Sequence, residues 1–100
     1  MEIITHHIEA IRALCVKHKV SKLYVFGSVL TDRFNSDSDI DFLVEFSDVE
    51  LPEYAENYFD LKDGLKKLLQ RNVDLLELKA LKNPYLISSI QATQELLYAA

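Results

Sequence analysis

Cysteine is nearly missing from this chain of 100 residues, and its single thiol, Cys15, has no partner for a disulfide within the chain. The sequence therefore excludes a disulfide-stapled scaffold and favours a reducing compartment. Only two glycines and two prolines are present, which predicts short loops and little disorder. No apolar run approaches the roughly 20 residues of a membrane span, and the N-terminus lacks a signal-peptide pattern. We expect a cytoplasmic protein without a membrane segment.

Positive charge is also scarce, with 11 Lys and Arg against 16 Asp and Glu, for a net charge of −5. This acidic balance argues against a protein that tracks nucleic-acid phosphates, which normally carries a basic stripe. The one concentration of basic side chains is interpreted as the solvated face of a helix; it comprises Lys62, Lys66, Lys67 and Arg71. Length and composition predict one globular domain over residues 1–100, with a single modest core.

The hydrophobic pattern predicts helices and strands that alternate along the chain. Helices are expected over 4–18 and 52–70, one or two helical turns over 28–33, and strands over 22–26, 39–46 and 73–78. Asn83 and Pro84 are typical of a helix start, and Leu97 is placed on the inner stripe of that last helix, although 95–99 could instead end as a strand. This order predicts an α/β (α+β) fold, in which helices flank a small sheet of three to four strands.

Two acidic residues begin the clearest strand, in the segment Asp39-Ile40-Asp41. Side chains two apart in a strand share a face, with Cα atoms about 6.5–7 Å apart, so both carboxylates can reach ions between them. Hard oxygen ligands of this kind suit Mg²⁺, and a pair of ions bridged by carboxylates supports in-line phosphoryl displacement. Asp74 occupies an early position in another apolar strand and is a third candidate, as a metal ligand or as a general base.

Gly27-Ser28 ends the strand that precedes this acidic pair. Glycine allows the backbone to approach a phosphate closely, and free N–H groups at the start of a helix favour an anion. The Ser28 hydroxyl adds another donor. Together with the aspartates, this turn predicts a site for a nucleoside triphosphate and its metal ions.

Each feature also has a simpler interpretation. A Gly-Ser pair is usually an ordinary turn, Asp39 follows residues that favour turns and caps, and Asp74 could pair with Arg71 or with a nearby lysine. The spacing and the strand placement, taken together, favour the phosphate-and-metal interpretation.

With these motifs the chain resembles the minimal nucleotidyltransferases (MNT type) of the DNA polymerase beta superfamily. The resemblance rests on the segments Val25-Phe26-Gly27-Ser28, Ser38-Asp39-Ile40-Asp41-Phe42-Leu43-Val44, Val73-Asp74-Leu75 and Asn83-Pro84-Tyr85-Leu86. It implies a mixed sheet flanked by helices, the nucleotidyltransferase fold, and transfer of a nucleoside monophosphate with release of pyrophosphate. Asp39 and Asp41 would be shared ligands of two Mg²⁺ ions, Asp74 the third carboxylate, and Gly27 and Ser28 the triphosphate-binding residues.

The resemblance extends to MntA-like antitoxins of HEPN/MNT toxin–antitoxin pairs, which implies ATP as substrate and a tyrosine of a HEPN-domain toxin as acceptor. A homo- or hetero-oligomer is compatible with this group. The chain departs from many relatives at Thr31, where they carry an Arg that contacts phosphate. Two other functions stay open: an MNT module that neutralises its partner by binding alone, and a small-molecule nucleotidyltransferase, which generally adds a second domain.

Overall fold

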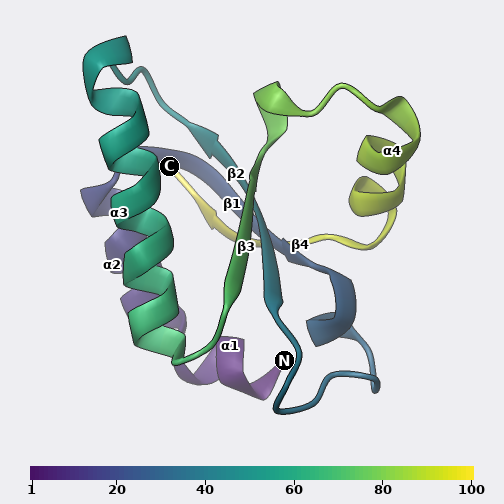
Figure 1. Cartoon of the computed structure of the whole chain (residues 1–100). Coiled ribbons are helices and arrows are strands. Elements are labelled where there is room, and N and C mark those ends of the chain that lie inside the picture. The colour runs from purple at the N-terminus through teal and green to yellow at the C-terminus, as the bar shows by residue number, and fades with distance from the viewer.

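A computed structural model describes residues 1–100, and its elements alternate between helix and strand (Figure 1). In chain order they are α1 (Glu2–His6), α2 (Ile8–Lys17), β1 (Val20–Phe26), the 3-10 turn η1 (Gly27–Leu30), β2 (Ile40–Phe46), α3 (Leu51–Leu69), β3 (Val73–Glu77), the 3-10 turn η2 (Leu78–Ala80), α4 (Pro84–Thr93) and β4 (Glu95–Ala99). The predicted α/β (α+β) class is confirmed. No helix has both the length and the apolar character needed to cross a membrane.

The four strands form one mixed sheet in the order β3-β2-β1-β4. β1 runs antiparallel to both β2 and β4, whereas β2 runs parallel to β3. β2, which contains Asp41 of the acidic pair, is therefore an inner strand, as its nearly continuous apolar sequence suggests. The mixed sheet implied by the family resemblance is confirmed.

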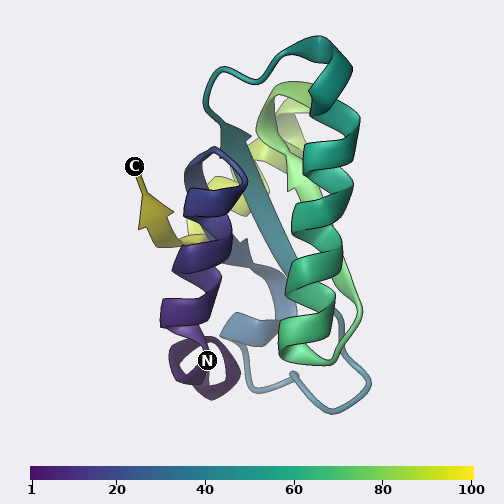
Figure 2. The same cartoon turned by 90° about the vertical axis from the view of Figure 1, so that its left-hand side faces the viewer.

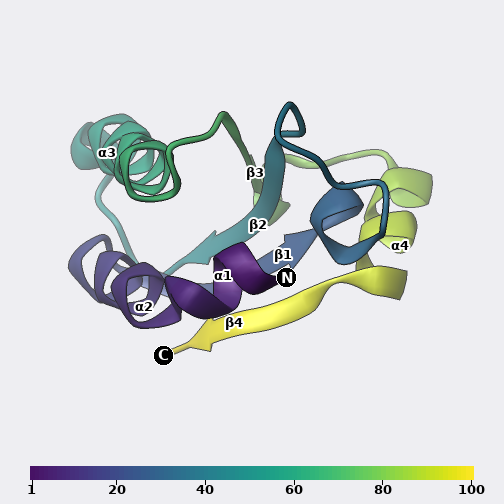
Figure 3. The same cartoon turned by 90° about the horizontal axis from the view of Figure 1, so that it is seen from below.

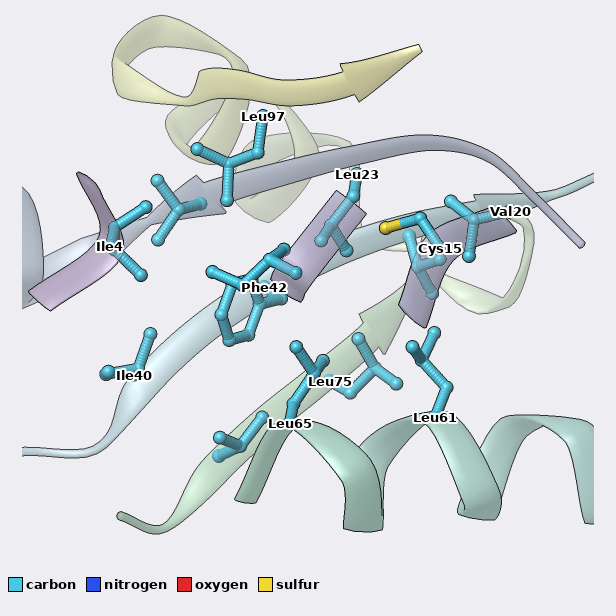
Figure 4. Packing of buried hydrophobic residues seen from close by; sticks show 14 of the residues in the cluster. Ile4, Cys15, Val20, Leu23, Ile40, Phe42, Leu61, Leu65, Leu75 and Leu97 are labelled. Atoms are coloured by element: carbon cyan, nitrogen blue, oxygen red, sulfur yellow. The ribbon is translucent and has the colours of Figure 1, made fainter. Parts of the chain in front are cut away.

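Helices α2 and α3 lie side by side over one face of the sheet, and α4 lies on the opposite side (Figures 1 and 2). Alternate residues of the strands point toward α2 and α3 and form the main core. Phe42 of β2 and Leu75 of β3 meet Leu61 and Leu65 of α3 there, and all four side chains are buried (Figure 4). The strand residues that alternate with these core residues consequently face away from the core. They include Asp41 of β2 and Asp74 of β3.

The first predicted helix is divided at His7, where α1 ends and α2 begins. The His7 backbone leaves the helical region, with φ −108° and ψ 13°, and its Nδ1 lies 2.8 Å from the carbonyl oxygen of Ile3. The bend places Ile4, which is 1% exposed, in the same core cluster as Ile11. The prediction of one continuous helix over 4–18 is therefore wrong. The chain bends because burying Ile4 in the core favours two short helices over a single regular one.

The last helix is shorter than the pattern predicts. α4 is capped by Asn83, whose side chain accepts hydrogen bonds from the N–H groups of Tyr85 and Leu86 at 2.9 and 3.3 Å, as its sequence indicates. The helix ends at Thr93, and Leu97 is buried on β4 instead of on a helical stripe. The alternative of a closing strand is the correct one, since β1 offers it an edge to pair with.

Candidate active site

The segments that carry the predicted site meet at one end of the sheet. Because β1 is antiparallel to β2, the end of β1 lies beside the start of β2, with Phe26 opposite Asp41. Because β3 is parallel to β2, its start lies at the same end. Figure 3 looks at this end directly and shows η1 and the loop before β2 next to the strand starts. Topology thus gathers Gly27, Asp39, Asp41 and Asp74, which are spread over 48 positions of the sequence.

Asp41 and Asp74 are direct partners in the register of β2 and β3. Neighbouring strands are about 4.8 Å apart, so two side chains at matched positions on one face lie next to each other. Both aspartates point away from the core that contains Phe42 and Leu75. The parallel pairing of β2 and β3 therefore places the two carboxylates side by side.

Gly27 lies against Asp41 from the other side. Its φ is +80°, a left-handed conformation that favours glycine. A Cβ atom at this position would overlap Oδ2 of Asp41 and would lie 3.3 Å from its Cγ. The turn after β1 and the first carboxylate of β2 are therefore in contact, and only a residue without a side chain leaves room for both.

Negative charge accumulates at this end of the sheet. Burial raises the pKa of the Asp41 carboxyl above its ordinary value, and the charges of Asp74 and Asp39 raise it further. None of the three salt bridges of the structure includes these aspartates, so the alternative that Asp74 pairs with Arg71 or a lysine is wrong. A bound cation would relieve this repulsion.

The donor set fits Mg²⁺ in chemistry, because it consists of carboxylate oxygens on adjacent backbone segments. Asp39 lies one residue before β2, and the side chains of Asp39 and Asp74 are exposed, whereas Asp41 is half-buried. The structure contains no group of three or more His, Cys, Asp or Glu side chains arranged to surround one ion. Asp39, Asp41 and Asp74 could each offer carboxylate oxygens to a Mg²⁺ ion, which usually takes its other ligands from water and substrate phosphates.

The segment after Gly27 forms one helical turn, the shorter of the two predicted lengths. This 3-10 turn, η1, ends at Leu30, and Thr31 is already extended. The Ser28 carbonyl accepts hydrogen bonds from the Thr31 N–H at 2.9 Å and from its hydroxyl at 2.8 Å, and the same hydroxyl accepts from the Arg33 N–H at 3.2 Å. Thr31, where the family resemblance leads to the expectation of an Arg, thus closes the turn with its hydroxyl.

Two residues near the site have contacts that the sequence analysis missed. Arg71 is not part of a solvated helical face, because α3 ends at Leu69 and the guanidinium hydrogen-bonds the loop before β2. Tyr58 packs on the core, and its hydroxyl also donates to the carbonyl oxygen of Leu75 on the edge strand β3. All three hydrogen bonds link residues that are distant in sequence, so no local sequence pattern indicates them.

The architecture around these carboxylates is that of a nucleotidyltransferase. It matches a solved structure described provisionally as a minimal nucleotidyltransferase, with a TM-score of 0.78 and 30% identity over 94% of this chain and 92% of that one. A chain of a complex described as a tri-AMPylated HEPN toxin of Shewanella oneidensis with an MNT antitoxin has the same fold, with a TM-score of 0.67 and 21% identity over 96% of this chain and 72% of that one.

The chain belongs to the nucleotidyltransferase domain family, whose profile matches residues 7–95. A relative from Methanocaldococcus jannaschii, MJ0128, provisionally named a protein adenylyltransferase, is 43% identical over 82 residues, which are 82% of this chain and 79% of the relative. The resemblance to the minimal nucleotidyltransferases drawn from the sequence motifs is thereby confirmed.

Proposed function

We propose that this nucleotidyltransferase is a Mg²⁺-dependent protein adenylyltransferase, which transfers AMP from ATP to a tyrosine of a HEPN-domain toxin and so acts as its antitoxin. The observation that carries the proposal is the direct register of Asp41 with Asp74, next to a glycine turn that touches Asp41. A similar fold in a complex that contains an AMPylated HEPN toxin supports the acceptor. The provisional name of MJ0128 supports the transferred group.

In the proposed reaction, the phenolic oxygen of the acceptor bonds to the α-phosphorus of ATP, the bond from that phosphorus to the bridging oxygen breaks, and pyrophosphate leaves with the electron pair. Mg²⁺, when bound, neutralises phosphate charge in this exchange. Asp39 and Asp41 would hold the metal, with two ions expected. Gly27 and Ser28 would contact the triphosphate, since glycine allows close approach of the backbone.

Asp74 is assigned to the attacking hydroxyl, as the third metal ligand or as the base that accepts the phenolic proton. Its position beside Asp41 and its exposure suit this role, because an acceptor on another protein must reach it from solvent. The exposed site also suits a macromolecular acceptor better than a small molecule, which is usually enclosed in a pocket.

The test uses the full chain and a HEPN-domain protein, to be sought in the reading frames next to its gene, incubated together with ATP and Mg²⁺. Mass spectrometry is expected to find AMP on a tyrosine of the HEPN protein, and removal of Mg²⁺ with a chelator should abolish the modification. Asp39→Asn combined with Asp41→Asn should also abolish it, because both carry the metal. Asp37→Asn is the matched control, since this exposed aspartate of the same loop contributes only its backbone N–H to a hydrogen bond.

A double variant that labels the partner as fast as the wild type would show that the carboxylate assignment is wrong. If the wild type transfers nothing to the HEPN protein, the proposed acceptor is wrong. Labelling of a small hydroxylated antibiotic in its place would favour the small-molecule alternative.

A second candidate function is neutralisation of the partner by binding alone. It is favoured by Thr31, whose hydroxyl is engaged in the turn and which cannot supply the phosphate contact of an Arg. In this case the double aspartate variant would still suppress the toxin in a co-expression growth assay, although no AMP would be found on the toxin.

A further inference from the structure

Arg71 lies in the connection between α3 and β3, on the side of the loop that precedes β2. α3 ends at Leu69, and Gln70 adopts a left-handed conformation with φ 52°, which turns the chain out of the helical path. Arg71 is half-buried at the mouth of a polar hollow that Asp39 and Lys66 also line. Its side chain is thus directed at the backbone of residues 34–38.

The guanidinium group makes three contacts with that loop. Its Nη1 donates hydrogen bonds to the carbonyl oxygens of Asn35 at 2.7 Å and of Ser38 at 2.9 Å. Its central carbon lies 4.4 Å from the ring centre of Phe34, within the range of a cation–π interaction. A planar guanidinium can stack and donate at the same time, which a lysine ammonium cannot do.

The loop is already closed by bonds of its own. The Asn35 side chain accepts from the Asp37 N–H at 2.8 Å, and the Asn35 N–H donates to the Ser38 hydroxyl at 3.1 Å. The Ser38 N–H donates a hydrogen bond to the Asn35 carbonyl oxygen at 3.1 Å. Arg71 therefore attaches a preformed unit, not a loose segment, to the end of α3.

Asp39 follows immediately after the carbonyl that Arg71 binds. On its other side, the Ile40 N–H donates to the carbonyl of Asn72, the neighbour of Arg71, at 3.1 Å. The backbone of Asp39 is thereby connected on both sides to the segment that leads into Asp74. None of the salt bridges involves the Asp39 side chain. The position of its carboxylate therefore depends on these hydrogen bonds of the neighbouring backbone.

We propose that Arg71 is a positioning residue, which sets the location of the Asp39 carboxylate relative to Asp41 and Asp74 and so determines the metal affinity of the site. The inference rests on the proposed function, in which Asp39 is a metal ligand. Some residues do not bind a metal but hold its ligands in place. Replacing such a residue typically lowers metal affinity or activity about 10–100-fold.

The test compares Arg71→Ala with Arg71→Lys, and uses Lys66→Ala as the matched control, because Lys66 is an exposed cation that lines the same hollow. Mn²⁺ affinity is measured on the full chain by electron paramagnetic resonance, without ATP or partner. The Mg²⁺ concentration for half-maximal AMP transfer is measured separately. Amide hydrogen exchange at Ser38 and thermal melting report on the loop and on the fold.

For Arg71→Ala we expect Mn²⁺ affinity to fall about tenfold or more, with a matching rise in the Mg²⁺ requirement. Amide exchange at Ser38 should become faster, since its loop loses the two hydrogen bonds and the Phe34 contact of Arg71. Arg71→Lys keeps a charge and N–H donors but loses the planar guanidinium, and should give an intermediate affinity even if the alanine variant folds poorly. Lys66→Ala should match the wild type in all measurements.

Unchanged Mn²⁺ affinity in both Arg71 variants, with only a lower melting temperature, would overturn the inference and leave Arg71 a structural residue. A wild type that binds Mn²⁺ through Asp39 but transfers no AMP would refute the proposed function alone. The two failures are therefore distinguishable.

Discussion

Replacement of Gly27 by alanine tests the contact between the turn and the carboxylate site, and the other glycine of the chain provides its control. An alanine at φ +80° costs about 1–2 kcal/mol, because an L-residue is crowded in the left-handed region. Its Cβ would also overlap Oδ2 of Asp41, and moving that side chain off its rotamer costs about 0.5–1.5 kcal/mol. The free energy of unfolding should therefore fall by roughly 2–3 kcal/mol.

Activity should fall further than stability. A displacement of about 1 Å at a reacting centre can reduce the rate about 100-fold, and the displaced group here is the central carboxylate of the site. Urea denaturation and Mg²⁺-dependent AMP transfer, measured on the folded fraction, separate the two effects. In an Asp41→Ala background the overlap is gone, so Gly27→Ala should then cost only the backbone contribution.

Gly64→Ala is expected to behave differently. Gly64 lies inside α3, where alanine favours the helix by about 1 kcal/mol, and its Cβ would lie 3.0 Å from the flexible end of Leu14. This variant should be as stable as the wild type or slightly more stable, with unchanged transfer. A Gly27→Ala protein that keeps full stability and full activity would refute the proposed constraint of the turn on Asp41.

Three further predictions concern the supporting structure. Asn83→Ala should lower the free energy of unfolding by about 1 kcal/mol, whereas Asn83→Ser should retain the cap of α4, as urea titration can show. Tyr58→Phe leaves an edge carbonyl of β3 without its donor and should cost about 1–2 kcal/mol, with faster amide exchange in β3 as the diagnostic. Burial raises the pKa of the Cys15 thiol from 9.0 to about 12; the folded chain then keeps a proton that the unfolded chain loses, so stability should fall as pH rises from 9 towards 12. A thiol reagent should accordingly react with Cys15 at the rate of unfolding, and immediate reaction in native buffer would contradict this.

The local parts of the fold could be predicted because their signals lie within a few residues. Helical spacing of Leu61 and Leu65 identifies α3, and the Asn83-Pro84 pair marks the start of α4. The spacing from Gly27-Ser28 to Asp39 and Asp41 identified the family, which the profile match confirms. The roles of these residues in metal and phosphate binding, and the extent of the chain as one domain, stay predictions.

Other features depend on partners far away in the chain, which a periodic pattern does not encode. The bend at His7 follows from burial of Ile4, and the strand that contains Leu97 forms because β1 has a free edge. Arg71 resembles its helical neighbours in sequence, yet it bonds carbonyls 33 and 36 positions earlier.

The sequence by itself determined which residues carry the carboxylates and the glycine turn, because strand alternation and turn chemistry are local properties. The tertiary structure alone decided that Asp74 stands directly beside Asp41, since strand register is set by long-range pairing and core packing. It also decided that the Gly27 turn touches the Asp41 carboxylate, since that contact exists only once β1 and β2 have paired.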